Sequence, residues 1–257
     1  MAADAEALLL VLAEHHARLI RGWSEFTADQ WACASRNERW SVHQTVRHVA
    51  DVIERGATAA DGDNDVELLD QFDPLATPGV WLEGSSGESP GATIERFDVE
   101  ARRFRDAVRT RLASEDDALA TTVYGDAHWT MNVAHLLWDS WIHERDVLIP
   151  FGIEQRSPVN EERLVGLYGV FMSAVPSKLF DQAMSATVEL VGHNRSTLSL
   201  SFDGRQIRCR ENSGAAVGAT GEHGPAIDAL AGRGLAVEQA LPGAPPEMGL
   251  LAAYFNS

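Results

Sequence analysis

The chain has 257 residues, of which 45% are hydrophobic, and it carries a formal net charge of -17. The hydrophobic fraction suffices for a sizeable core and excludes a disordered chain. The negative charge would repel nucleic acid and anionic membrane surfaces, so we expect neither as a partner. The length fits two domains.

Targeting signals and cysteine positions indicate where the protein is located and which metal ligands it can offer. Acidic residues open the chain where a signal peptide would be basic, and no apolar run reaches the roughly 18 to 20 residues of a membrane span. We therefore expect a cytoplasmic protein. The only two cysteines, Cys33 and Cys209, lie far apart and show no ligand-like spacing. Any metal would therefore have histidine and carboxylate ligands.

The first part of the chain is predicted to be helical, because apolar residues recur there at intervals of three and four. Capping boxes at Thr27–Gln30 and Ser41–Gln44 mark two helix starts. The stretch 61–91 is polar, Gly-rich and acidic, which predicts mostly loop and is typical of a lid or an active-site rim. The long helices are expected at about 4–23, 41–60, 93–114, 130–150 and 159–182.

The pattern changes near the end of the chain. Apolar and polar residues alternate over 186–191 and 197–202, as in half-buried strands. Asp203-Gly204 predicts a hairpin turn into a returning strand at 205–210. We also expect a short helix at 224–231 and a further strand at 235–238. All seven Trp residues fall at or before Trp141, and we predict two domains, 1–183 and 184–257.

Three potential metal ligands, His135, Asp139 and His143, follow one another at four-residue spacing. On an α-helix these positions share one face, each about 6 Å from the next. Two imidazoles and a carboxylate can bind a zinc-type ion, especially with one more ligand from another helix.

Asp139 and His143 form the best ligand pair, and His48 on another helix would be the third ligand. His135 is either a fourth ligand or a pocket residue one turn away. Asp146 can accept the second ring N–H of a ligand imidazole, and Trp138 fits a pocket wall. An Asp–His pair at this spacing can also be a plain hydrogen-bonded surface pair.

Three segments of the sequence carry distinctive motifs. The first runs from Trp40 to His48, with His eight residues after Trp. The second is Asp139-Ser-Trp-Ile-His143-Glu-Arg-Asp146, and the third is Gly224-Pro-Ala-Ile-Asp-Ala-Leu-Ala-Gly-Arg233. In this order, the three segments resemble the signatures of the mycothiol-dependent maleylpyruvate isomerase family of DinB-like metalloenzymes, and the resemblance spans nearly the whole chain. The family usually has Glu at the position of Asp139, so the metal would lie closer to that helix here, or His135 could act as a substitute ligand.

The resemblance implies a DinB-like four-helix bundle with a metal in its core and a small C-terminal α/β domain. The metal, most simply Zn, would hold the thiolate of mycothiol, a sugar thiol, for attack on a small electrophile. The product would be a cis-trans isomer or an S-adduct. Arg233 would bind a substrate carboxylate or stabilise an enolate, because Arg offers a bidentate fork.

Two other functions fit the same residues. The chain could be a non-catalytic metal- or ligand-binding module of this fold. It could also be a metal-dependent hydrolase, in which the metal activates water instead of thiol. The electrophile, the oligomeric state and the choice among Zn²⁺, Ni²⁺, Co²⁺ and Fe²⁺ stay open at this point.

Overall fold

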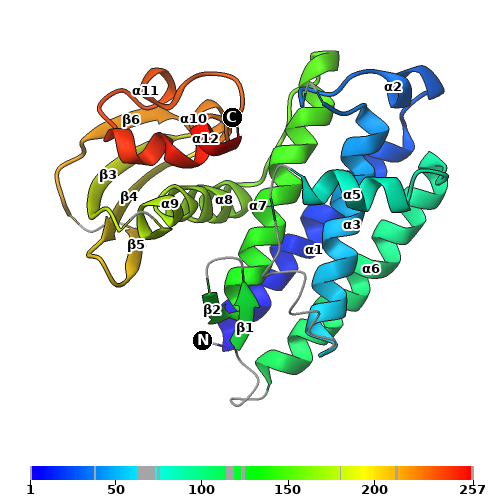
Figure 1. Ribbon diagram of the computed structural model, residues 1–257, viewed down its shortest axis with the longest axis horizontal. Coiled ribbons are helices and arrows are strands. Elements are labelled where there is room, and N and C mark those ends of the chain that lie inside the picture. Colours follow the sequence, from blue (N-terminus) through cyan, green and yellow to red (C-terminus); the bar gives the residue numbers. More distant parts are fainter. Residues whose placement is uncertain are drawn as a thin grey trace. The chain divides into compact units, whose positions relative to one another are not determined.

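The structure is a computed structural model, and it describes residues 2–37, 39–62, 73, 76–113, 119–122, 125–179, 181–211 and 214–255. The chain forms two compact units, Met1–Arg156 and Ser157–Ser257 (Figure 1). The first unit is helical apart from a small hairpin, and the second contains a four-stranded sheet. The protein is therefore mostly helical with a small mixed sheet, as the fold class predicted.

The first unit contains α1 (Ala2–Ser24), α2 (Ala28–Ala32), α3 (Val42–Ala60), α5 (Thr77–Gly84), α6 (Pro90–Leu112) and α7 (Trp129–Leu148). A short antiparallel hairpin, β1 (Leu119–Thr122) and β2 (Gly125–His128), precedes α7, and a 3-10 turn at Ile149–Phe151 follows it. Of the long helices, α1 and α3 each pack against both α6 and α7. The four long helices expected in this part of the chain are confirmed.

Both predicted capping boxes are present. The Ser41 hydroxyl accepts the Gln44 backbone N–H at 3.2 Å, and the Gln44 side chain accepts the Ser41 N–H at 2.8 Å. Thr27 and Gln30 form the same reciprocal pair at the start of α2. The reciprocal bonds satisfy two backbone donors at a helix start. They fix where α3, the helix that carries His48, begins.

Aromatic side chains form the centre of the first unit. Trp23, Phe97, Phe104 and Trp141 are each at most 2% exposed. Trp23 and Phe97 meet edge to face with ring centroids 5.1 Å apart. Burying such a side chain stabilises the fold by about 1.5 to 3 kcal/mol. This packed centre joins α1, α6 and α7.

One helix in the first unit was not expected. The stretch 61–91, predicted as mostly loop, contains α5 (Thr77–Gly84); residues 63–72, 74 and 75 lie outside the described residues. Two glycines in α5 give it weak helix propensity. Arg47 of α3 compensates, donating from Nη1 to the Ser85 carbonyl at 2.8 Å and from Nη2 to the Leu82 carbonyl at 3.2 Å. A tertiary contact thus stabilises this helix end.

The second unit contains α8 (Val159–Met172), α9 (Val175–Leu179), β3 (Met184–Val191), β4 (Arg195–Phe202), β5 (Ile207–Glu211), β6 (Ala219–Glu222), α10 (His223–Leu230), α11 (Val237–Ala240), a 3-10 turn (Pro246–Gly249) and α12 (Leu250–Phe255). The strand order is β5-β4-β3-β6, with β6 parallel to β3 and the other pairs antiparallel. Gly204 makes the predicted hairpin turn at φ 88°.

The boundary between the units differs from the expected one at 183/184. It lies between Arg156 and Ser157, because α8 packs on β4, β5 and α10. The expected helix 159–182 also divides into α8 and α9, and the expected strand at 235–238 is wrong, since Val237 starts α11. The strand β6 was missed. A Cβ on its Gly221 would overlap the Ala240 carbonyl oxygen, so glycine is needed there.

Among the described residues, none of the helices is both long and apolar enough to cross a membrane.

Candidate metal centre

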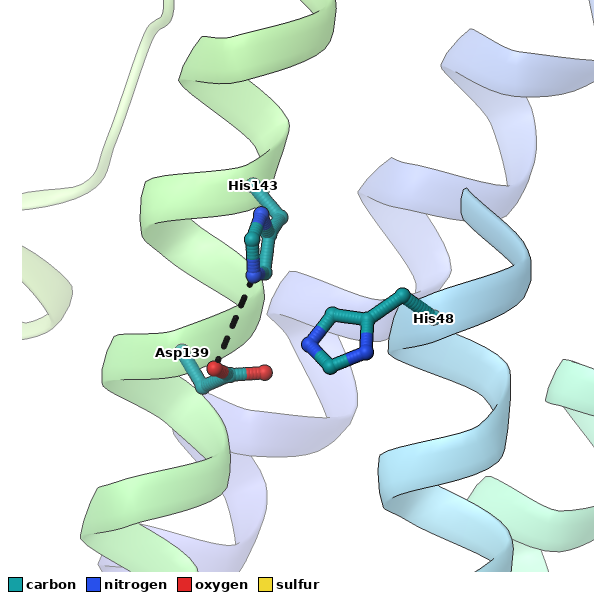
Figure 2. Close-up of side chains that lie close together, drawn as sticks. All are labelled: His48, Asp139 and His143. Atoms are coloured by element: carbon teal, nitrogen blue, oxygen red, sulfur yellow. Dashed lines mark ion pairs between the residues drawn. The ribbon is translucent and has the colours of Figure 1, made fainter. Parts of the chain in front are cut away.

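Three of the predicted ligands lie together in the first unit. One ligand atom from each of His48, Asp139 and His143 lies within 4.8 Å of the other two. His48 comes from α3, whereas Asp139 and His143 come from successive turns of α7 (Figure 2). Two helices therefore present two imidazoles and one carboxylate to a common point.

The geometry of this cluster suits a metal ion. His143 Nε2 lies 3.7 Å from Asp139 Oδ1, and the His48 and His143 ring centroids are 5.0 Å apart. Ligands held about 2.0 to 2.1 Å from zinc at tetrahedral angles lie about 3.3 Å from one another, close to the first distance. Histidine nitrogen and carboxylate oxygen also fit the donor preference of zinc and its neighbours. The residues present therefore fit a divalent ion with three protein ligands.

The cluster is largely shielded from water. His48 is 6% exposed, and the side chains of His143 and Asp139 are 7% and 17% exposed. Trp40, which precedes α3, lies against both imidazoles, with ring centroids 4.8 Å from His48 and 6.2 Å from His143. An apolar wall of this kind lowers the local dielectric and limits solvent access.

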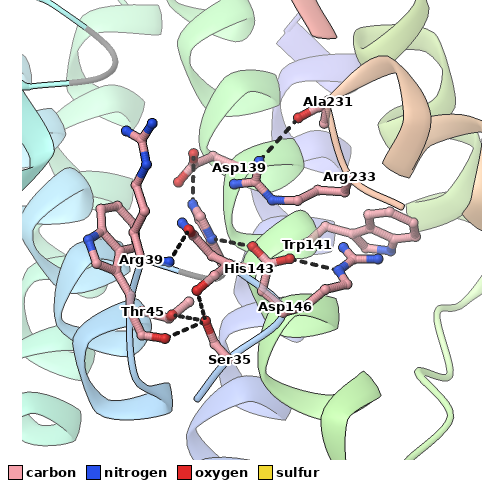
Figure 3. A network of polar contacts seen from close by, with 12 residues as sticks. Ser35, Arg39, Thr45, Asp139, Trp141, His143, Asp146, Ala231 and Arg233 are labelled. Atoms are coloured by element: carbon pink, nitrogen blue, oxygen red, sulfur yellow. Dashed lines mark hydrogen bonds and ion pairs between the residues drawn. The ribbon is translucent and has the colours of Figure 1, made fainter. Parts of the chain in front are cut away.

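Asp146 occupies the position expected of a carboxylate behind a ligand. Its Oδ2 lies 3.0 Å from His143 Nδ1, and the residue is fully buried (Figure 3). A carboxylate accepts only, so Nδ1 of His143 carries the proton and donates. In the neutral imidazole, Nε2, the nitrogen that faces Asp139, then keeps its lone pair. This tautomer is the one a metal ligand needs.

Arg36 completes this arrangement and was not anticipated from the sequence. Its Nε donates to Asp146 Oδ1 at 2.9 Å, and its backbone N–H donates to the Asp146 carbonyl at 2.8 Å. The loop that carries it is tied to α3, since Thr45 Oγ1 donates to Ser35 Oγ at 3.0 Å. Ser35 Oγ in turn donates to the Trp40 carbonyl. The loop thus places both Arg36 and Trp40.

His135 and Trp138 lie on α7 outside the three-residue cluster. Their ring centroids are 6.0 Å apart, and Trp138 is buried. Burial lowers the pKa of His135, an effect that the nearby Asp139 carboxylate partly offsets. His135 is therefore kept neutral at physiological pH. His135 is not one of the three residues whose ligand atoms converge, and its role and that of Trp138 stay predictions.

Arg233 belongs to the second unit. It follows α10, where its backbone N–H donates to the Asp228 carbonyl at 2.8 Å and its Nη1 to the Ala231 carbonyl at 3.4 Å. Its predicted role toward a substrate stays a prediction.

Comparison with known proteins gives one clear relation. No family model matches the chain, and no curated protein matches its sequence. Two solved structures do match: the mycothiol-dependent maleylpyruvate isomerase, at TM-score 0.58, and a histidine-to-alanine mutant of it, at TM-score 0.57. Each is 15% identical and covers 96% of this chain and 98% of its own. At this identity the likeness shows a shared fold along nearly the whole chain.

Proposed function

We propose that this protein is a metal- and mycothiol-dependent enzyme that attacks a small electrophile with a thiol, as a maleylpyruvate isomerase or a related S-transferase. The cluster of His48, Asp139 and His143 carries the proposal, because it offers a divalent ion three ligands and leaves a position open. The shared fold with an isomerase of that dependence supports it. We further propose a DinB-like four-helix bundle for the first unit.

The residues of the chain have separate parts in this proposal. A bound divalent metal would lower the pKa of a coordinated thiol and supply thiolate at neutral pH. Asp146 holds the proton of His143 on Nδ1, which keeps Nε2 available. Trp40 limits water around the two imidazoles. Arg233 is proposed to bind a substrate carboxylate, a cation that an anionic substrate needs in a chain of net charge -17.

The proposed isomerisation needs no further reactant. The thiolate sulfur forms a bond to one carbon of the conjugated double bond, and the π electron pair moves to the carbonyl oxygen. Rotation occurs about the resulting single bond. The pair then returns, the C–S bond breaks, and the thiolate is released unchanged. In the transferase variant the C–S bond is kept, the enolate carbon takes up the proton that the thiol released, and the adduct is the product.

The test compares metal content and turnover in the wild-type protein, His143→Ala and His193→Ala. His193 is an exposed histidine of the second unit and serves as the matched control. We expect about one equivalent of metal in the wild type and the control, and almost none in His143→Ala. Maleylpyruvate should isomerise only with mycothiol present. Equal metal content in all three proteins would contradict the proposed site, and hydrolysis of the substrate without thiol would indicate a hydrolase.

A further inference from the structure

A polar hollow of about 510 Å³ lies in the first unit, lined by side chains of α3, α5 and α6. Its volume is in the range of sites that bind small molecules. Asp51 and Arg55 of α3 line one side, Trp81 of α5 lines another, and Arg96 of α6 also lines it. None of these residues belongs to the metal cluster described above.

The wall formed by α5 is held in place from α3. Besides the two bonds that Arg47 donates to carbonyls at the end of α5, the Arg55 guanidinium carbon lies 4.0 Å from the centre of the Trp81 ring. A cation over an indole face is worth about 0.5 to 2 kcal/mol. The hollow is thus shaped before any ligand arrives.

The guanidinium of Arg96 forms ion pairs with three carboxylates. Its Nε donates to Glu88 Oε1 at 2.8 Å, and its Nη1 donates to Glu54 Oε2 at 2.8 Å. Its Nη2 lies 2.9 Å from Asp51 Oδ1 and also donates to Glu88. These contacts fix the charged groups in the lining of the hollow and leave Arg96 few donors for a ligand.

Two oxygen atoms in the lining lack a hydrogen-bond partner among the described residues. Within the described part of the chain, neither Oδ2 of Asp51 nor Oγ of Ser85 has a hydrogen-bond partner, and both atoms are buried. The Asp51 side chain is only 8% exposed. A buried acceptor without a partner costs free energy, so a hydrogen-bond donor arriving from a ligand would be favourable here.

The charges indicate what kind of ligand fits. An anion would meet three carboxylates, those of Asp51, Glu54 and Glu88, and a cation would meet the guanidinium groups of Arg55 and Arg96. A neutral molecule rich in hydroxyl groups avoids both conflicts. Each hydroxyl can donate to a carboxylate oxygen and accept from a guanidinium or a serine hydroxyl.

We propose that this hollow binds a sugar or cyclitol, and that it holds the hydroxylated part of the thiol cosubstrate. The second clause rests on the proposed function. Asp51 and Arg55 follow His48 by three and seven residues on α3, so all three share one face of the helix. Arg55 lies about 10 Å along the axis from His48. A sugar thiol can span that length with its sulfur at the metal ligands.

The test uses S-methyl mycothiol, whose blocked sulfur cannot form a thiolate, so that binding reports the hydroxylated part. Calorimetry would compare the wild-type protein with Asp51→Asn and Ser85→Ala. Asp98→Asn is the matched control, because Asp98 is an exposed α6 carboxylate paired with Arg102. We expect Kd to rise about tenfold or more in Asp51→Asn and severalfold in Ser85→Ala, and to stay unchanged in the control.

Unchanged Kd in both hollow variants, or no binding to the wild type, would overturn the inference. Tighter binding of spermidine or inorganic phosphate at the same residues would overturn the neutral-ligand assignment. If Asp51→Asn does not fold, Ser85→Ala decides the outcome. Metal content and thiol-dependent turnover are measured separately. If the protein shows thiol-dependent turnover but neither hollow variant changes Kd, only this inference is overturned. If S-methyl mycothiol binds but the protein holds no metal, only the proposed function is overturned.

Discussion

Nδ1 of His143 lies 3.0 Å from Oδ2 of Asp146, and this contact determines which nitrogen of the imidazole faces Asp139. A neutral histidine that donates from Nδ1 keeps the lone pair on Nε2. The second oxygen of Asp146 is occupied by Arg36. The carboxylate is therefore held from both sides, and it cannot turn away from His143 without losing an ion pair.

Replacing Asp146 should weaken metal binding without removing a ligand. Asp146→Asn is expected to raise the zinc dissociation constant about 10- to 100-fold, as changes behind a ligand usually do. The measurement is competition with a chromophoric chelator. Asp98→Asn makes the same chemical change on an exposed helix face and should leave the affinity at the wild-type value. An Asp146→Asn protein with wild-type affinity would contradict the role assigned to this contact.

Two variants of Asp139 separate the effect of carboxylate charge on metal affinity from the effect of side-chain length. Asp139→Asn keeps the shape but loses the carboxylate, and its metal affinity should fall by more than the about 100-fold limit for residues behind a ligand. Asp139→Glu keeps the carboxylate on a side chain one methylene longer. It should stay within about tenfold of the wild type, because Asp139 faces an imidazole on the same helix at 3.7 Å. Equal losses in the two variants would argue against ligation by Asp139.

The two cysteines should differ sharply in reactivity. Cys33 is exposed, whereas burial raises the pKa of Cys209 to about 12. The thiolate is the reactive form, so at pH 8 very little of Cys209 can react. Iodoacetamide followed by peptide mass spectrometry should show labelled Cys33 and unmodified Cys209. Denaturant should make both react, and equal labelling of the native protein would refute the difference.

Stability should fall in mild acid because of His16. Burial keeps the pKa of His16 well below its ordinary value, and the neighbouring His15 and Arg105 act in the same direction. Below pH 6.5 the unfolded chain therefore takes up a proton that the folded chain does not. The free energy of unfolding drops by up to about 1.4 kcal/mol per pH unit as pH falls. Urea unfolding at pH 7.5 and 5.5, with chelator present, measures this drop.

His16→Leu should reduce the difference between those two pH values, whatever its effect on stability at pH 7.5. His193→Leu, which removes an exposed histidine, is the control and should keep most of the difference. The same pH dependence in the wild-type and His16→Leu proteins would show that another group is responsible.

The sequence predicted the helices that carry the cluster because their signals are local. The Ser41 box marks the start of α3, and four-residue spacing places Asp139 and His143 on one face of α7. That spacing also included His135, which lies outside the cluster. Which members of a helical stripe converge depends on how α3 packs against α7. A periodic pattern does not contain that information.

Long-range contacts explain what the sequence did not predict. Arg36 reaches Asp146 across 110 positions, and no local pattern marks an arginine in a loop as part of that pair. The helix α5 depends on Arg47, which lies 35 positions before Leu82. Likewise, the sequence of α8 has the same helical pattern as the first part of the chain, but α8 packs against β4, β5 and α10. Helical periodicity identifies a buried face without identifying what covers it.

The strand order of the second unit also bears on self-association. An open sheet ends in strands whose free backbone groups can pair with another chain, which is a common route to aggregation. Here the outermost strand on one side, β6, has four residues and runs directly into α10. On the other side, β5 carries the exposed Arg208 and Arg210. A second copy would have to stack like charges or extend a very short strand, so both margins of the sheet disfavour polymerisation through added strands.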